Sequence, residues 1–91
     1  MRVRAAIEKK LGEGLNPRRL SVVDESHLHA GHTHAPEGGE SHFRVEVVSA
    51  AFAGLNRVAR QRLVYGLLAE EMKDRIHALA LRTLTPEEDR G

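Results

Sequence analysis

Histidine is the residue type best able to bind a metal in this sequence, and its distribution is uneven. The stretch ESHLHAGHTHAPEGGESH, residues 25–42, holds five of the six histidines, and the sixth is His77. Imidazole nitrogen binds zinc, nickel, copper and iron, but the chain has no cysteine and can offer no thiolate. Any metal must therefore be held by histidines and carboxylates, or by thiolates that another molecule supplies.

The histidine-rich stretch contains two H-x-H pairs, His27 with His29 and His32 with His34. In an extended segment, residues two apart project to the same side about 7 Å apart, near enough to chelate one ion. Four imidazoles can hold Zn²⁺, Ni²⁺ or Cu²⁺ without a partner, although histidine-rich tracts also bind such ions adventitiously. A self-contained metal-binding loop is thus one hypothesis, and exposed loop histidines that bind nothing are the plain alternative.

Enzymatic catalysis has little support in the sequence. There is no cysteine nucleophile and no glycine-rich phosphate loop. Ser26 and Ser41 adjoin His27 and His42, but sequence neighbours rarely form a catalytic triad. We expect a protein that is not an enzyme, and we expect His42 to be structural because it directly precedes the apolar Phe43.

The elements that position these residues begin with an N-terminal amphipathic helix of about three turns. Its apolar stripe falls four residues apart, at Val3, Ile7, Leu11 and Leu15. We expect Gly12, Gly14 and Asn16-Pro17 to close this helix.

Two strands are expected on either side of the histidine-rich stretch. RRLSVVD, residues 18–24, places Leu20 and Val22 on one face, and HFRVEVVS, residues 42–49, alternates apolar with mostly polar residues from Phe43 onward. The connection over residues 25–41 is far longer than a tight hairpin turn. Connections of that length are usually functional or disordered, so we expect a mobile loop there.

The second half predicts helix, helix, strand and a short tail. Ser49 can cap a turn in AAFAG, and Asn56 can cap a longer helix over residues 57–74. RIHALALRTL, residues 75–84, is typical of a third, largely buried strand, and TPEE is a capping box for a last helix. Because so few residues follow, we expect 85–91 to be a frayed tail. The order predicts an α+β domain with helices on one face of a three-stranded sheet.

Composition limits the possible functions further. The chain has 91 residues, enough for one domain with one core, and its 41% hydrophobic and 30% charged residues are typical of a soluble globular protein. A formal charge of +1 gives no argument for strong nonspecific attraction to nucleic acid or membrane. No apolar run is long enough to span a bilayer, and we expect a cytoplasmic protein.

Several motifs together resemble the BolA family. They are VVDESHLH, GESHFRVEVVSAAFAG, RQRLVYGLLAEE and IHALALRT, and the match runs from about residue 3 to residue 86. The resemblance implies a fold similar to the class II KH domain, an αββααβ sandwich with a mixed sheet, which agrees with the predicted order. It also implies a partner, a monothiol glutaredoxin with which BolA-like proteins share a [2Fe-2S] cluster in iron-sulfur trafficking or iron regulation.

The resemblance also implies which residues hold the cluster. In the family one ligand lies in the loop between the first two strands and another at the start of the last strand. The second matches His77 of IHAL, and the first is best matched by His29, with His32 and His34 as further candidates. Glutaredoxin and glutathione would supply the thiolates, so we expect no cofactor on the isolated chain, a monomer alone and a heterodimer with the partner.

A competing hypothesis is a DNA-binding transcriptional regulator, as some bacterial members of the family are described. Its candidate residues are the arginines of the second predicted helix, Arg57, Arg60 and Arg62. The family commonly has histidine between the last two, where this chain has Gln61, so no role of that histidine transfers. The G-x-x-G of RNA-binding KH domains is also absent after Gly54, which argues against RNA recognition through that loop.

Overall fold

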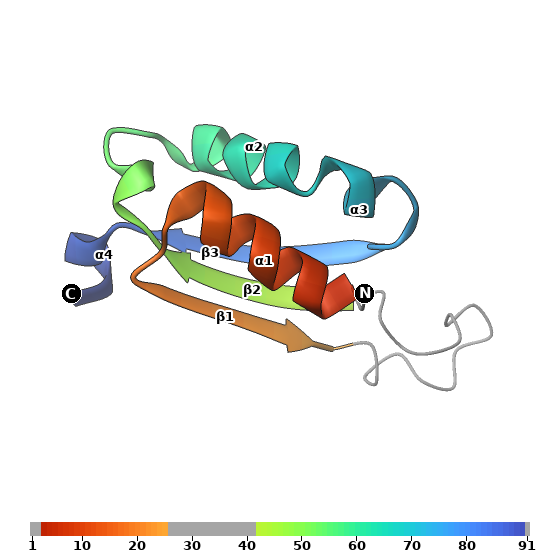
Figure 1. Cartoon of the computed structure of the whole chain (residues 1–91). Coiled ribbons are helices and arrows are strands. Elements are labelled where there is room, and N and C mark those ends of the chain that lie inside the picture. The colour runs from red at the N-terminus through yellow and green to blue at the C-terminus, as the bar shows by residue number, and fades with distance from the viewer. Residues whose placement is uncertain (1–2, 26–41, 91) are drawn as a thin grey trace.

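The computed structural model describes residues 3–25 and 42–90 of the chain (Figure 1). In chain order the elements are α1 (Val3–Leu15), β1 (Arg19–Asp24), β2 (His42–Val48), the 3-10 helix η2 (Ala50–Phe52), α2 (Arg57–Leu67), α3 (Ala69–Asp74), β3 (Ala78–Leu84) and α4 (Pro86–Arg90). Among these residues, no helix combines the length and the apolar character that crossing a membrane requires.

The three strands form one mixed sheet in the order β1-β2-β3. β1 runs antiparallel to β2, with Arg19 opposite Val48, whereas β3 runs parallel to β2, with His42 opposite Ala78. Parallel neighbours need a crossover connection, and η2, α2 and α3 supply it. The sheet confirms the predicted three-stranded mixed architecture.

Helices α1, α2 and α3 cover one face of the sheet (Figure 1). Apolar residues of the other elements face this layer because burial removes their aliphatic surface from water. The expectation that the third strand is largely buried is wrong, because β3 lies at the edge of the sheet, with Ala78 and Ala80 exposed and Leu79 and Leu81 half-buried. The core comprises Val3, Ile7, Leu11 and Leu15 of α1, Val22 of β1, Phe43, Val45 and Val47 of β2, and Phe52, Val64, Leu68 and Ile76. The α+β class with helices on one face is therefore confirmed.

The single helix expected over residues 57–74 is wrong, because the structure divides it at Leu68. Leu68 has φ −104° and ψ 20°, outside helical geometry, and separates α2 from α3. Its N–H still bonds to the carbonyl of Val64, and its own carbonyl accepts from Met72. Its side chain is fully buried, so the break keeps Leu68 in the core while α3 takes a new direction.

The glycines near the end of α1 do not stop the helix, which continues to Leu15. Asn16 follows with φ 45°, the left-handed conformation common after a helix C-terminus. A Cβ at Gly14 would lie 2.7 Å from the nearest side-chain atom of Leu67, so this glycine permits close approach of α1 and α2.

The C-terminal residues form the short helix α4, which begins with the predicted capping box. The N–H of Thr85 donates to Glu88, and the N–H of Glu88 donates to the hydroxyl of Thr85. Ion pairs also join Glu88 to Arg60 and Asp89 to Arg19. Fraying of this tail, a statement about dynamics, stays a prediction.

Candidate functional site

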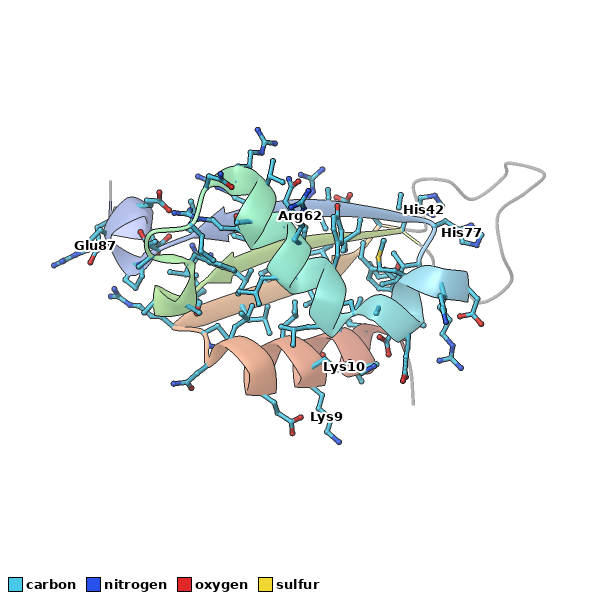
Figure 2. All side chains as sticks on the ribbon, turned by 90° about the horizontal axis from the view of Figure 1, so that it is seen from above. Lys9, Lys10, His42, Arg62, His77 and Glu87 are labelled. Carbon is cyan, nitrogen blue, oxygen red and sulfur yellow. The ribbon has the colours of Figure 1, made fainter. Side chains whose placement is uncertain are left out.

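The described histidines meet at one end of the sheet. His42 begins β2, and His77 directly precedes β3. The strands are parallel, so their starts lie side by side, and the two imidazole centroids are 6.0 Å apart with an angle of 68° between the ring planes. Figure 2 shows both rings together where β2 and β3 begin. Two imidazoles far apart in sequence therefore form one cluster.

Buried neighbours fix the backbone on which each imidazole stands. Phe43, which follows His42, is only 2% exposed and anchors the start of β2 in the core. Ile76, which precedes His77, is 4% exposed, and its N–H donates to the carbonyl of Glu71 at 2.8 Å. The imidazole of His77 lies at an exposed position and that of His42 at a half-buried one. The cluster is thus held by the core yet open to an approaching partner.

The connection between β1 and β2 starts and ends beside this cluster. The N–H of Glu25 donates to the carbonyl of His42 at 2.8 Å, and the Glu25 carboxylate pairs with Nε of Arg44 at 2.9 Å. These contacts hold the two chain ends of segment 26–41 next to each other. The candidate ligands His29, His32 and His34 lie in that segment, outside the described residues, so their roles stay predictions, as does the metal-binding loop with His27.

The proximity of His42 to His77 was not predicted. A usable signal existed, because each histidine lies at the start of a predicted strand and neighbouring parallel strands start at the same edge of a sheet. The sequence alone did not specify that β2 and β3 are parallel neighbours. Within the two described ranges, there is no group of three or more histidine, aspartate or glutamate residues that could hold one metal ion.

Arg60, the middle candidate for nucleic-acid binding, makes its contacts inside the fold. Its side chain is 13% exposed, and Nε donates to the carbonyl of Leu55 at 2.9 Å. The other guanidinium nitrogens reach the carbonyl of Thr83 and the carboxylate of Glu88, and the group lies 5.9 Å from the ring centroid of Phe52. Arg60 thus ties the start of α2 to β3 and α4.

Arg57 and Arg62, by contrast, are exposed on α2. In the part of the chain that the structure describes, neither forms an ion pair, and Figure 2 shows Arg62 on the helix surface. A groove of about 450 Å³ lies between the start of α2 and β3, and Arg57, Gln61 and Arg82 are among its lining residues. This surface offers positive charge beside a groove.

A larger groove, about 670 Å³, lies between α1 and α3 and carries charges of both signs. Lys9 and Lys10 of α1 are both among its lining residues, and Lys10 contacts the nearly buried carboxylate of Glu71 at 2.7 Å (Figure 2). Hydrogen bonding to Glu71 raises the pKa of Lys10 above its ordinary value. Positive and negative side chains both line this groove, so we expect it to attract a charged ligand less strongly than the groove beside Arg57.

Comparison with known proteins gives a consistent result. The family model described as BolA-like protein matches residues 11–88. The DNA-binding transcriptional regulator BolA of Vibrio cholerae is 49% identical over 86 residues, which cover 94% of this chain and 77% of that protein. The Escherichia coli protein of the same name is 45% identical over 91 residues, covering 100% and 83%. The solved structure of BolA1 from Arabidopsis thaliana superimposes with a TM-score of 0.87 at 40% identity, covering 97% and 96%.

Proposed function

This chain belongs to the BolA family, and from that membership we propose that it is a non-enzymatic accessory protein that binds a monothiol glutaredoxin and co-ligates a [2Fe-2S] cluster. The supporting observation is the position of His77. This imidazole is exposed, it is anchored by the buried Ile76, and it lies beside the two ends of the histidine-bearing segment. Residues from distant parts of the sequence can therefore contribute to one site.

The donor set of the chain fits a shared cluster. A [2Fe-2S] cluster takes four protein or small-molecule ligands, and a chain without cysteine can offer imidazole only. A glutaredoxin cysteine and the thiol of glutathione would supply the thiolates. When bound, such a cluster supplies one-electron redox chemistry, and replacing thiolate by neutral imidazole raises its reduction potential.

We propose His77 and His29 as the two imidazole ligands, with His32 and His34 as the other candidates for the second. His29 is four residues from Glu25, so their Cα atoms lie no more than about 14 Å apart. Glu25 is itself hydrogen-bonded to His42, the neighbour of His77. Chain length therefore allows His29 to approach His77.

Reconstitution with a monothiol glutaredoxin, glutathione, iron and sulfide tests this function. With the wild-type chain, we expect visible absorption and circular dichroism spectra that differ from those of the glutaredoxin alone. His77→Ala should remove the difference while the two proteins still form a complex in size-exclusion chromatography. His29→Ala, His32→Ala and His34→Ala, made singly, identify the second ligand. Identical spectra for wild type and His77→Ala would rule out the assignment of His77.

A second candidate function is DNA binding, and one observation favours it. Arg57 lines the groove, Arg62 is exposed on the same helix, and no ion pair with another described residue neutralises either. Two relatives also carry the name DNA-binding transcriptional regulator BolA. We infer that phosphate contacts, if this chain makes them, come from Arg57 and Arg62 and not from Arg60.

The salt dependence of DNA affinity tests this second function. Arg57→Gln with Arg62→Gln should weaken binding and reduce the slope of log affinity against log salt by about 2, since about one unit is lost per phosphate contact. Lys9→Gln with Lys73→Gln removes the same charge from other exposed positions and should leave the slope nearly unchanged. Equal effects of the two double variants would point to net charge alone, and absence of binding at low salt would exclude this function.

A further inference from the structure

We propose that His42 and His77 form a binding site for a divalent transition metal ion in the isolated chain. The site needs neither a partner protein nor the histidines between residues 26 and 41. It differs from the cluster site proposed above in its second ligand, His42, and in its cargo, a single ion such as Zn²⁺, Ni²⁺ or Cu²⁺. It shares only His77 with that site.

The separation of the two rings suits a bridging ion. Metal–nitrogen distances are about 2.0–2.1 Å and a ring centre lies about 1.2 Å from its nitrogen, so imidazoles on opposite sides of one ion have centroids about 6.4 Å apart. At a tetrahedral angle the same geometry brings the centroids to about 5 Å. The observed 6.0 Å lies between these limits. The separation of the two rings is therefore compatible with one ion between them.

The backbone under the two ligands is already in place. His42 lies in the β2–β3 ladder opposite Ala78, the residue after His77, so the strand pairing sets the distance between the two backbones. The buried residues Phe43 and Ile76 hold both strand starts against the core. Ligands on rigid elements lose little conformational freedom when an ion binds, which favours affinity.

The surroundings leave room for the remaining ligands. His77 is exposed and His42 is half-buried, so water can reach an ion between them. Among the described residues, no third histidine or carboxylate joins His42 and His77 to form a larger group of ligands. Water therefore completes the coordination of the ion. Two imidazoles with water suit Cu²⁺, Ni²⁺ and Zn²⁺, and we expect Cu²⁺ to bind most tightly, as it does at most nitrogen sites.

Occupancy of this site has a consequence for the proposed function. An ion held by His77 must leave before that imidazole can ligate a cluster. The two proposals are nevertheless tested separately, because ion binding is measured without glutaredoxin, glutathione, iron or sulfide. Failure of ion binding would leave cluster ligation intact, and failure of cluster ligation would leave the ion site intact.

The experiment uses the full chain with His27, His29, His32 and His34 replaced by alanine. Titration with ZnCl₂ is followed by calorimetry and by NMR of the imidazole nitrogens. We expect one equivalent of Zn²⁺ to bind, with the resonances of His42 and His77 shifting together. The proposal is overturned if this variant binds no Zn²⁺, or if the two imidazoles do not respond.

Phenylalanine variants separate ligation from ring packing. His42→Phe and His77→Phe, each made in that background, keep an aromatic ring at the contact and remove the ligating nitrogens. We expect each variant to lower the Zn²⁺ affinity at least about tenfold. Removing a residue that only supports a metal ligand already costs about that much, and removing the ligand itself should cost no less. Dispersed amide spectra check that both variants fold. Unchanged affinity in either folded variant would overturn the site.

Discussion

A guanidinium nitrogen of Arg60 lies 2.6 Å from a carboxylate oxygen of Glu88, and this pair joins the start of α2 to the C-terminal helix. The same carboxylate accepts the N–H of Thr85 and so caps α4. Hydrogen bonding by Arg60, followed by that of Thr85, holds the pKa of Glu88 below its ordinary value of 4.5. Glu88 therefore caps the start of α4 and also joins this helix to α2.

Glu88→Gln should lower the melting temperature by a few degrees at neutral pH, because it weakens both contacts. A carboxylate whose pKa is lowered by folding stabilises the protein fully above pH 4.5, and this contribution is lost as pH falls through the lowered pKa. The melting-temperature difference between wild type and Glu88→Gln should therefore shrink as pH falls below 4.5. Thermal unfolding from pH 7 to pH 3 measures it.

The matched control is Glu87→Gln, since Glu87 is exposed on the same helix and makes no hydrogen bond or ion pair with another described residue (Figure 2). It removes the same charge and should change the melting temperature little at any pH. If both variants shift it equally, net charge and not the Arg60 contact is responsible.

Local patterns in the sequence were enough to predict most of the fold. The spacing of Ile7 and Leu11 and the alternation of Phe43 and Val45 report which face of each element is buried, because helix and strand have different side-chain periods. The caps at Ser49 and Asn56 were also predictable, since a short polar side chain there satisfies a free backbone N–H. These are interactions between residues close in sequence.

What the sequence did not reveal depends on contacts between distant residues. The meeting of His42 and His77 requires β2 and β3 to be parallel neighbours, and the internal contacts of Arg60 require α2 to lie against β3 and α4. A pattern of apolar and polar residues shows which side of an element is buried but not which partner covers it. The sequence-based choice of Arg60 as a candidate DNA-binding residue therefore missed its contacts inside the fold.

Ser49 links the end of α1 to the start of η2, and replacing it should destabilise the fold. Its hydroxyl donates to the carbonyl of Leu15 at 2.6 Å and accepts from the N–H of Ala51 at 3.1 Å. Ser49 is 1% exposed, so Ser49→Ala leaves a buried carbonyl without its donor, which costs about 1–3 kcal/mol. Urea unfolding measures the loss.

The control for Ser49 is Ser21→Ala on β1, a half-buried position opposite Glu46. Its effect should stay within about 0.5 kcal/mol, the usual range for substitutions away from buried features. A loss at Ser49 no larger than at Ser21 would contradict the role given to the buried hydroxyl.

Gly12 and Gly14 should respond differently to alanine. Both lie in α1, where alanine is the better helix former. A Cβ at Gly12 meets no atom within 4 Å, so Gly12→Ala should stabilise the protein by about 0.5–1 kcal/mol. At Gly14 the Cβ would lie 2.7 Å from a terminal methyl of Leu67, whose side chain must shift, so this variant should be less stable than Gly12→Ala.

Urea unfolding of both glycine variants compares them directly, and Leu67→Ala provides the control for the collision. In that background the added methyl at Gly14 has space, so Gly14→Ala should be less harmful than in the wild type. If the effect of Gly14→Ala is the same in both backgrounds, contact with Leu67 does not determine it.

Lys10 and Glu71 form the ion pair between α1 and α3, and removing the lysine should destabilise the fold. Glu71 is 8% exposed, and its two carboxylate oxygens lie 2.7 and 2.9 Å from Nζ of Lys10. Lys10→Met leaves this carboxylate nearly buried without its counter-charge, so the melting temperature should fall by several degrees. Lys9→Met removes the same charge from an exposed neighbour and should have little effect.

A double-mutant cycle shows whether that loss comes from the pair itself. In a Glu71→Gln background no charge is left unpaired, so Lys10→Met should cost clearly less there than in the wild type. The pKa of Lys10 is raised chiefly by its hydrogen bond to Glu71, so the lysine contributes to stability below its unfolded pKa of 10.5 and this contribution is lost above it. Wild type should therefore lose stability toward high pH more steeply than Lys10→Met. An equal cost of Lys10→Met in both backgrounds would mean that the contact with Glu71 contributes nothing.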